Sequence, residues 1–466
     1  MPSSGEKQSI ESLNPSFRME HSYPVYFTRN ALDPANDLLA RAMELKGAEL
    51  PNEKESIPGL DATSSELSIS SDSTSLQDMA RTRNRRPVRY LIILDAGLLE
   101  ARPGLQQELY SYFKNYHSID PGPGQTIVLP GGEACKNEFS HLTSIYEAVA
   151  RQRIDRHSYI LAIGGGALID VAGFAAATAH RGIRLIRIPT TVLAQNDASV
   201  GVKNGMNFAG RKNFIGSFAP PNAVINDFAF LDSLSDRDKR AGMAEAIKVA
   251  LIRDGAFFQW MEAHAGQLGR FESWALEHLI FRCAELHLNQ ISRGGDPFES
   301  GSARPLDFGH WSAHKLEELS GHSIRHGEAV AMGMALDSIY SWKMGILEEK
   351  EVNRVLSLLR LLEFPLYTEF WNQLSIEQSL QEFREHLGGE LCITLLEATG
   401  QAREVHTIDA RKMHESLQYL QARFAKPEDR RVHINGEGGL PGKIETKSEP
   451  EKNSENKSES DIGSAS

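Results

Sequence analysis

Cysteines and long apolar runs are both rare in this 466-residue sequence. Its three cysteines, Cys135, Cys283 and Cys392, lie far apart, so they form neither a disulfide framework nor a cysteine metal cluster. Such usage suits a reducing compartment. No apolar stretch approaches the roughly 20 residues that cross a bilayer, and the first residues lack the apolar core of a signal peptide. We therefore expect a cytoplasmic protein with no membrane partner.

Basic residues are outnumbered by acidic ones, with 50 Lys and Arg against 62 Asp and Glu and a net charge of -12. Because no basic stripe reverses this balance, we expect no nucleic-acid partner. An acidic protein can still bind an anion where a few cations converge on one cleft. The partner that we expect is a small molecule.

Two segments hold too few apolar side chains to offset the entropy lost on ordering them. One is the serine-rich, acidic stretch 60–78, and the other is the charged stretch 426–466. We expect disorder in residues 1–21, in an insertion near residues 50–84 and in residues 426–466.

Between these segments, apolar strands alternate with amphipathic helices, which predicts a parallel α/β sheet. The expected strands span 88–99, 125–130, 159–166 and 183–190, and the expected helices span 104–116, 138–152 and 168–179. After about residue 236 the periodicity is helical, as in 237–264 and 274–292. We predict an α/β N-terminal domain over 22–235 and a mainly α-helical C-terminal domain over 236–425, with a ligand cleft between them.

A glycine triplet, Gly164 to Gly166, joins an apolar strand to a helix that carries Asp170 in its first turns. Glycines at a helix N-terminus let an anion approach the backbone amides. Tight strand-to-helix turns also use glycine, and the spacing is not that of the usual dinucleotide fingerprint. The triplet alone leaves both interpretations open.

The segment from Arg187 to Phe218 combines hydroxyl, carboxylate, cationic and amide side chains with several glycines, which predict loops. Cations and amides together suit a phosphate ester, whereas the alternative is a basic surface loop. We favour the ligand site, since the polar groups are dense and the flanking residues look like buried strands.

Glu245 and Lys248 lie one helical turn apart in an otherwise apolar run. A surface pair of this spacing contributes only a few tenths of a kcal/mol. In a buried helix, however, a carboxylate and an amine need strong partners or a function.

Four histidines crowd the stretch 307–330. His310 and His314 share one face if that stretch is helical, and His322 and His326 have the same spacing. The glycine before His322 favours a loop there. Spacing does not choose between the pairs, but four histidines so close together favour at least two metal ligands.

Several motifs occur together in one order and spacing: "LPGGEACK", "GGGALIDVAGF", "HRGI", "IPTTVLAQNDASVGVKN", "GRKNFIGSF", "AGMAEAIK", "FGHWSAH" and "HGEAVAMGM". In this the chain resembles the sugar phosphate cyclases, of which 3-dehydroquinate synthase is the central member. The resemblance runs from about Tyr23 to about residue 420, with the serine-rich segment as an insertion. It implies a dehydroquinate synthase-like fold, with an NAD-binding α/β domain before a helical domain that binds zinc and substrate.

The resemblance also implies an activity. Such an enzyme is a homodimeric carbon–oxygen lyase that uses NAD and zinc, with cobalt as another suitable ion, to close a sugar phosphate into a carbocycle. Oxidation of an alcohol to a ketone acidifies the neighbouring C–H, phosphate leaves, the ketone is reduced again, and an aldol step closes the ring. NAD is regenerated in each turnover.

By the same resemblance, the metal takes one histidine from each pair, with Glu245, His310 and His326 as its ligands. His314 is then catalytic, and His322 matches no family residue. The residues expected at NAD are Glu133, Lys136, Gly165, Gly166, Asp170, Thr190, Thr191 and Lys212. Those expected at the substrate and its phosphate are Asp197, Lys203, Asn213, Lys248 and, from a second subunit, Arg181.

The sequence departs from the family where 3-dehydroquinate synthases bind the substrate carboxylate. A family lysine, arginine and asparagine correspond here to Asn289, Ala303 and Asp307, although Arg304 adjoins the second place. A later family lysine falls near Arg384 and Glu385. Fewer cations and an added carboxylate disfavour an acidic substrate. We predict a carboxylate-free sugar phosphate, such as a heptulose phosphate.

Two other functions compete with the cyclase. A metal-dependent alcohol dehydrogenase related to glycerol dehydrogenase is similar in the glycine triplet and the histidine helix, but it does not need the phosphate set Arg181, Lys203 and Asn213. A non-catalytic binding protein has no reason to keep the Glu245, His310 and His326 trio.

Overall fold

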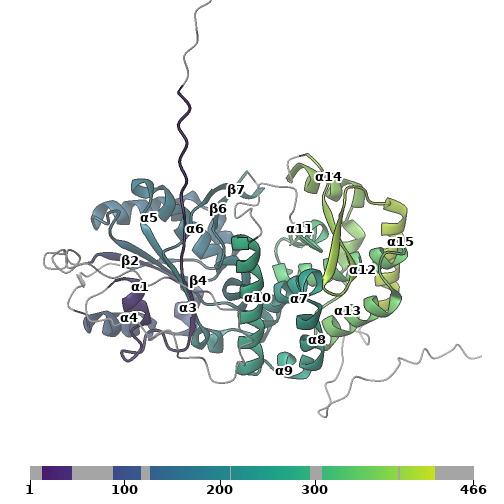
Figure 1. Cartoon of the computed structure of the whole chain (residues 1–466), viewed down its shortest axis with the longest axis horizontal. Coiled ribbons are helices and arrows are strands. Elements are labelled where there is room, and N and C mark those ends of the chain that lie inside the picture. Colours follow the sequence, from purple (N-terminus) through teal and green to yellow (C-terminus); the bar gives the residue numbers. More distant parts are fainter. Residues whose placement is uncertain are drawn as a thin grey trace, which may run out of the picture. The chain divides into compact units, whose positions relative to one another are not determined.

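The computed structural model describes residues 13–44, 88–116, 126–209, 211–293, 307–386 and 389–425. Most of the predicted disorder lies outside these residues, namely residues 1–12, the insertion near 50–84 and the segment 426–466, as do Ala303 and Arg304. The described residues belong to one compact unit, Met1–Val432 (Figure 1). Among them, no helix combines the length and the apolarity that a membrane crossing requires.

Six strands form a parallel sheet in the order β1-β8-β5-β4-β2-β3. They are β1 (Val25–Thr28), β2 (Tyr90–Asp95), β3 (Thr126–Leu129), β4 (Tyr159–Gly164), β5 (Arg184–Pro189) and β8 (Ala223–Asp227). Every residue of β4 is buried, as expected for a parallel sheet that is covered on both faces. The sheet confirms the predicted parallel α/β architecture.

Helices cover both faces of this sheet (Figure 1). On one face, Ile92 and Leu94 of β2 pack with α1 (Leu38–Ala42) and α4 (Leu105–Lys114). On the other, Leu91 and Ile93 pack with α5 (Phe139–Arg151) and α6 (Gly166–Thr178). Successive side chains of a strand point to opposite faces, so the continuous apolar run of β2 makes both faces of the sheet apolar.

Two predicted elements end earlier than expected, each at an aspartate. The strand predicted over 88–99 stops at Asp95, whose carboxylate accepts hydrogen bonds from Gly97 N and Leu98 N and starts α3 (Ala96–Ala101). The helical run 237–264 breaks at Asp254, which caps α8 (Gly255–Ala263) in the same way. Aspartate is a preferred N-cap, so it favours a new helix over continuation of the old element.

The loops predicted within 187–218 are partly wrong, since β6 (Lys203–Phe208) and β7 (Arg211–Phe218) form an antiparallel hairpin. The glycines allow close strand contact there. A Cβ on Gly205 would lie 3.1 Å from Ile215 O, and one on Gly216 would lie 2.8 Å from Asn204 O. Glycine inside a strand often marks such a close backbone approach.

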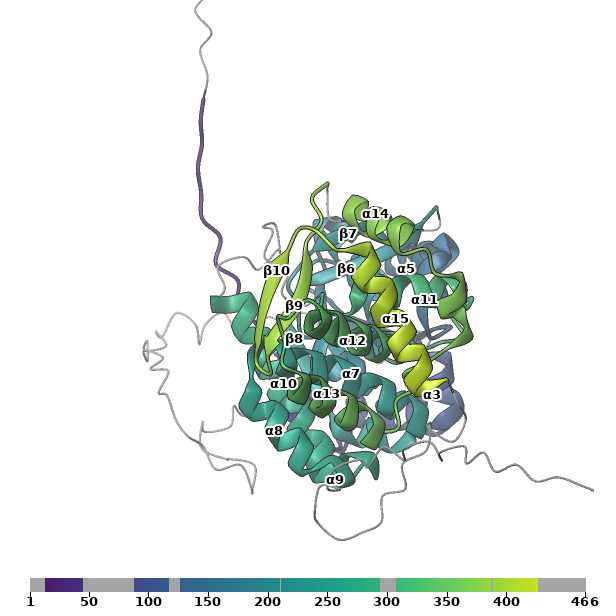
Figure 2. The same cartoon turned by 90° about the vertical axis from the view of Figure 1, so that its right-hand side faces the viewer.

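Helices dominate after residue 236, as predicted. They include α7 (Asp236–Arg253), α9 (Ala265–Gly269), α10 (Ser273–Arg293), α11 (His310–Leu319), α12 (His326–Lys343), α13 (Glu349–Leu361), α14 (Ile376–His386) and α15 (Ala410–Phe424). Helix α12 is buried from Gly327 to Ser341 and is surrounded by α7, α11, α13 and α15 (Figure 2). A small hairpin, β9 (Ile393–Ala398) and β10 (Gln401–Val405), was not predicted.

Helix α7 joins the helices to the sheet edge. A Cβ on Gly242 would lie 2.5 Å from Val192 Cβ, so the helix backbone rests directly on the residues that follow β5. Asn196 Nδ2 also donates to Gly242 O over 2.8 Å. This contact brings Glu245, one turn further along α7, close to the end of the sheet. The predicted limits of the two domains, 22–235 and 236–425, stay predictions.

Candidate active site

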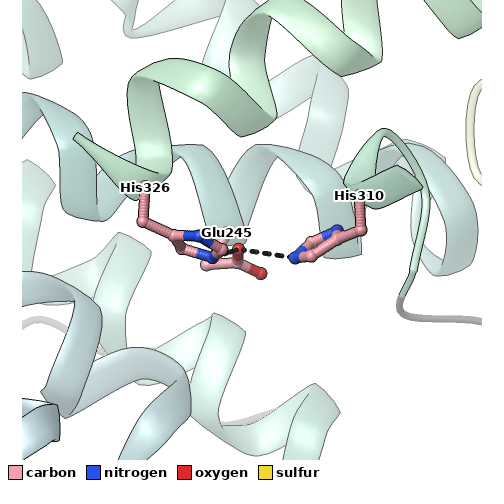
Figure 3. A group of neighbouring side chains, drawn as sticks. All are labelled: Glu245, His310 and His326. Carbon is pink, nitrogen blue, oxygen red and sulfur yellow. Dashed lines mark ion pairs between the residues drawn. The ribbon is translucent and has the colours of Figure 1, made fainter. Parts of the chain in front are cut away.

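Three helices each bring one side chain to a single point (Figure 3). Glu245 comes from the middle of α7, while His310 and His326 are the first residues of α11 and α12. Glu245 Oε1 lies 3.5 Å from His310 Nε2 and 3.4 Å from His326 Nε2. Among the described residues, this is the group of three that could hold a metal ion.

These distances suit a zinc-sized cation. Two ligands at about 2.1 Å from a tetrahedral ion lie about 3.4 Å from each other. The Glu245 carboxylate is 1% exposed; its Oε2 is ion-paired with Lys248 Nζ, and its Oε1 lies beside the two imidazole nitrogens. Burial alone would raise its pKa, but Lys248 and the two imidazoles hold that pKa well below the usual value. A buried, ionised carboxylate that faces two imidazole nitrogens fits a divalent cation.

Glu317, a buried acid on α11, supports His326. His326 Nδ1 lies 3.1 Å from Glu317 Oε2, and Lys212 Nζ lies 2.8 Å from Glu317 Oε1. Burial disfavours the imidazolium, but Glu317 and Glu245 raise the pKa of His326 to about 10. A carboxylate on the far nitrogen of a metal-binding histidine fixes its ring and leaves the other nitrogen for the ion. Sequence reasoning missed Glu317, although its spacing from His314 places it on the histidine face of α11.

His314 lies beside the trio without belonging to it. Its ring centroid is 5.5 Å from that of His310 and 6.2 Å from that of His326. Burial, and then the two neighbouring imidazoles, lower the pKa of His314 well below its usual value. His322 lies in the turn between α11 and α12 with φ 63°, as the preceding glycine predicted.

A second group of predicted residues gathers at the carboxyl edge of the sheet. Strand β4 lies beside β2, while the chain runs on from β2 to β3 and from β4 to β5 on opposite sides. Ligands of doubly wound sheets bind at such a reversal. Gly165 is the N-cap of α6 there, and a Cβ on it would lie 3.5 Å from Thr191 Cγ2. Thr190 N donates to Gly164 O over 3.0 Å, which ties the two loops together.

Lys136 contacts several polar and charged residues near this edge. Its ammonium group lies 2.6 Å from Asp170 Oδ2 and 3.9 Å from Glu133 Oε1, and it donates to Asn213 Oδ1. Burial disfavours the charged lysine, but Asp170 and Glu133 raise the pKa of Lys136. The structure thus places Asn213, predicted at the phosphate, against the predicted NAD residues. It places Lys212, predicted at NAD, against Glu317 beside the metal trio.

Arg187, which is 0% exposed, holds the segment between these groups. Its guanidinium donates to the carbonyls of Ser199, Gly201 and Lys203 and to Asn204 Oδ1. This segment follows η4 (Ala194–Ala198), which carries Asp197. His287 Nδ1 of α10 lies 2.7 Å from Asp197 Oδ1. Neither Arg187 nor His287 was predicted; nothing in their spacing marks them.

Of the other predicted residues, some lie near the metal trio and others lie away from it. Burial disfavours the charged Lys248, but Glu245 outweighs it and raises the lysine pKa, and Asp307 adds to that effect. Asn289 is half-buried on α10. Arg384 and Glu385 are exposed on α14, and Arg384 donates to Gly389 O beyond the end of that helix. Lys203 and Arg181 are also exposed, the latter at the far end of α6 from Gly165.

The sequence matches two adjoining family models. Residues 126–241 match 3-dehydroquinate synthase N-terminal, and residues 242–386 match 3-dehydroquinate synthase C-terminal. The chain belongs to the 3-dehydroquinate synthase family. It is therefore an enzyme of the sugar phosphate cyclase type, as its motifs indicated.

Curated and solved proteins of this superfamily are similar to this chain in sequence and in fold. The 3-dehydroquinate synthase of Nitrosospira multiformis is 39% identical over 283 residues, which are 59% of this chain and 75% of the relative. The 2-epi-5-epi-valiolone synthase of Streptomyces hygroscopicus subsp. jinggangensis, solved with NAD+ and Zn2+, is 27% identical, with a TM-score of 0.72 over 88% of this chain and 100% of that one. A 2-deoxy-scyllo-inosose synthase, solved with carbaglucose-6-phosphate, NAD+ and Co2+, is 25% identical, with a TM-score of 0.61 over 74% and 94%.

Proposed function

We propose that this enzyme eliminates phosphate from a carboxylate-free sugar phosphate, such as a heptulose phosphate, and closes the product by an intramolecular aldol step. It is then a carbon–oxygen lyase that depends on NAD and on zinc or cobalt. The feature that carries the substrate class is Asp307, a carboxylate where 3-dehydroquinate synthases have an asparagine, whose negative charge adds to the raised pKa of Lys248.

The residues present fit both cofactors. Glu245, His310 and His326 would hold the metal, which would supply Lewis-acid polarisation of a substrate oxygen. The N-terminus of α6, at Gly165 and Gly166, would receive the NAD pyrophosphate. When bound there, the dinucleotide would supply reversible hydride transfer. The resemblance to solved structures that hold NAD+ with Zn2+ or Co2+ supports both assignments.

The other side chains have defined tasks in this proposal. Lys248, charged beside Glu245 and Asp197, would orient substrate oxygens at the metal. His314, which burial and its neighbours keep neutral, can accept or donate a proton beside the metal trio. Lys203 and Asn213 would hold the phosphate, and that phosphate can itself take the proton from the adjacent carbon.

Arg181 would complete the phosphate site of a second subunit. It follows the 13 residues of α6, so it lies about 20 Å along the helix from Gly165 and does not reach its own chain's cofactor edge. We propose a homodimer in which this exposed arginine enters the partner's cleft. A cytoplasmic location is also proposed, in keeping with three free cysteines.

The decisive experiment incubates purified protein, NAD and zinc with a panel of sugar phosphates and follows released phosphate, cyclic product and reduced NAD. We expect a higher kcat/KM for a heptulose phosphate than for the acidic substrate of 3-dehydroquinate synthase, with no net reduced NAD. Asp307→Asn should raise kcat/KM for the acidic substrate by about tenfold, because one like charge is removed. Glu318→Gln, an exposed change on α11, is the control.

Three outcomes contradict the proposal in different ways. A higher value for the acidic substrate would make this an ordinary 3-dehydroquinate synthase with shifted carboxylate anchors. Stoichiometric reduced NAD with product would favour the alcohol dehydrogenase. Binding without turnover of any sugar phosphate would favour the non-catalytic alternative.

A further inference from the structure

Asp337 is a carboxylate in the middle of the buried helix α12, and it is 0% exposed. Its neighbours along the helix, such as Leu336 and Ile339, belong to the apolar core. A buried carboxylate destabilises a protein by several kcal/mol unless hydrogen bonds satisfy it. Asp337 therefore needs partners, and the structure shows where they are.

Two N–H groups donate to Asp337, and they flank His310 in the chain. Gly309 N donates to Asp337 Oδ2 over 3.1 Å, and Trp311 Nε1 donates to Asp337 Oδ1 over 2.9 Å. Both donors are neutral. Asp337 thus accepts hydrogen bonds at the start of α11 from the residues on either side of His310, a predicted metal ligand.

The Gly309 bond acts on the His310 ring through a single peptide unit. The carbonyl of that unit, Phe308 O, lies 3.2 Å from His310 Nδ1, and its N–H is the one that Asp337 holds. Because a peptide unit is planar, holding the N–H also aims the carbonyl. A carbonyl only accepts, so Nδ1 carries the proton and Nε2 keeps its lone pair toward Glu245.

The packing of α11 on α12 reinforces this turn. Gly309 has φ 79°, and a Cβ on Gly333 would lie 2.0 Å from Gly309 O. The two helices therefore touch backbone to backbone beside Asp337. The turn has little room to move except by losing its hydrogen bonds.

We propose that Asp337 is a positioning residue for the metal site, which sets the orientation and tautomer of His310 through the peptide unit Phe308–Gly309, with Trp311 as its second anchor. This inference rests on the proposed metal site. It does not depend on which sugar phosphate the enzyme uses.

The test measures zinc affinity by competition with a chromophoric chelator, on metal-free whole protein. We expect Asp337→Ala to weaken zinc binding by about 10- to 100-fold, as changes around metal-binding histidines typically do. Trp311→Phe keeps the aromatic bulk and the Gly309 bond, so it should weaken binding less. Asp337→Asn keeps an acceptor oxygen and should fall between these two. Ser338→Ala, a buried polar change on the same helix, should leave the affinity unchanged.

The outcomes separate this inference from the proposed function. Zinc affinity within twofold of wild type in both Asp337→Asn and Trp311→Phe would overturn the positioning role, even if both variants are less stable. If Asp337→Ala does not fold, these two milder variants still decide. A wild-type protein that binds no zinc would instead refute the metal site itself, whereas zinc binding without cyclase activity would refute only the reaction.

Discussion

The metal trio and the carboxyl edge of the sheet lie in the same compact unit but are made from different groups. The trio consists of side chains whose chemistry is visible in their residue types: one carboxylate and two imidazoles from three helices. The sheet edge consists largely of backbone, at Gly165 and the loops that follow β4 and β5, with a Lys136 and Asp170 pair beside it. A side-chain site tolerates no change of its ligands, whereas a backbone site is lost when something fills the space in front of it.

The largest effect should come from removing a ligand of the trio. His326→Ala should lose bound zinc and reduce kcat/KM by more than about 100-fold, beyond the range typical of residues that only support a ligand. Metal analysis of purified protein and steady-state kinetics measure both. His314→Ala is the matched control, because it should keep zinc and lose only rate; full zinc occupancy in His326→Ala would contradict the trio.

A smaller effect is expected when the sheet edge is filled. Gly165 has φ -73° and ψ 171°, which any residue adopts, and a Cβ there makes ordinary contact with Thr191. Gly165→Val should therefore fold and keep its zinc, while NADH binding weakens by about tenfold or more, or roughly 1.4 kcal/mol. Fluorescence titration with NADH measures this. Unchanged NADH binding would place the dinucleotide elsewhere.

The smallest effect on either site should come from the joint between them. In Gly242→Ala the new methyl group would meet Val192 Cβ at 2.5 Å and Leu193 N at 2.6 Å, so α7 must shift. Such overpacking destabilises the folded state by about 1–3 kcal/mol. The small shift of α7 should weaken zinc binding less than the loss of a ligand does. Denaturant unfolding measures the loss of stability. Gly104→Ala, where the nearest atom is 3.7 Å away, should be neutral, and equal stabilities would show that the joint is not tightly packed.

Periodicity and capping residues account for most of the elements that the sequence predicted. Strands β2, β4 and β5 and helices α4, α5, α6, α7 and α10 lie where apolar patterns indicated. The hairpin of β6 and β7 was not predicted, because glycines in a sequence favour loops and the pattern does not show that these glycines lie against another strand. Asp95 and Asp254 are visible in the sequence as caps, yet aspartate also occurs in loops, so only the hydrogen bonds decide their role.

The candidate active site also contains residues that the sequence indicated and residues that only the fold revealed. Residue types alone indicated a buried Glu245 and at least two metal-binding histidines, because carboxylate and imidazole are the groups that bind such ions. They did not choose between the two histidine pairs, since that choice depends on α11 and α12 both starting beside α7. Glu317, His287, Arg187 and Asp337 became visible only in the fold. Their partners are distant in sequence, and a hydrogen bond depends on distance and direction in space, which packing decides.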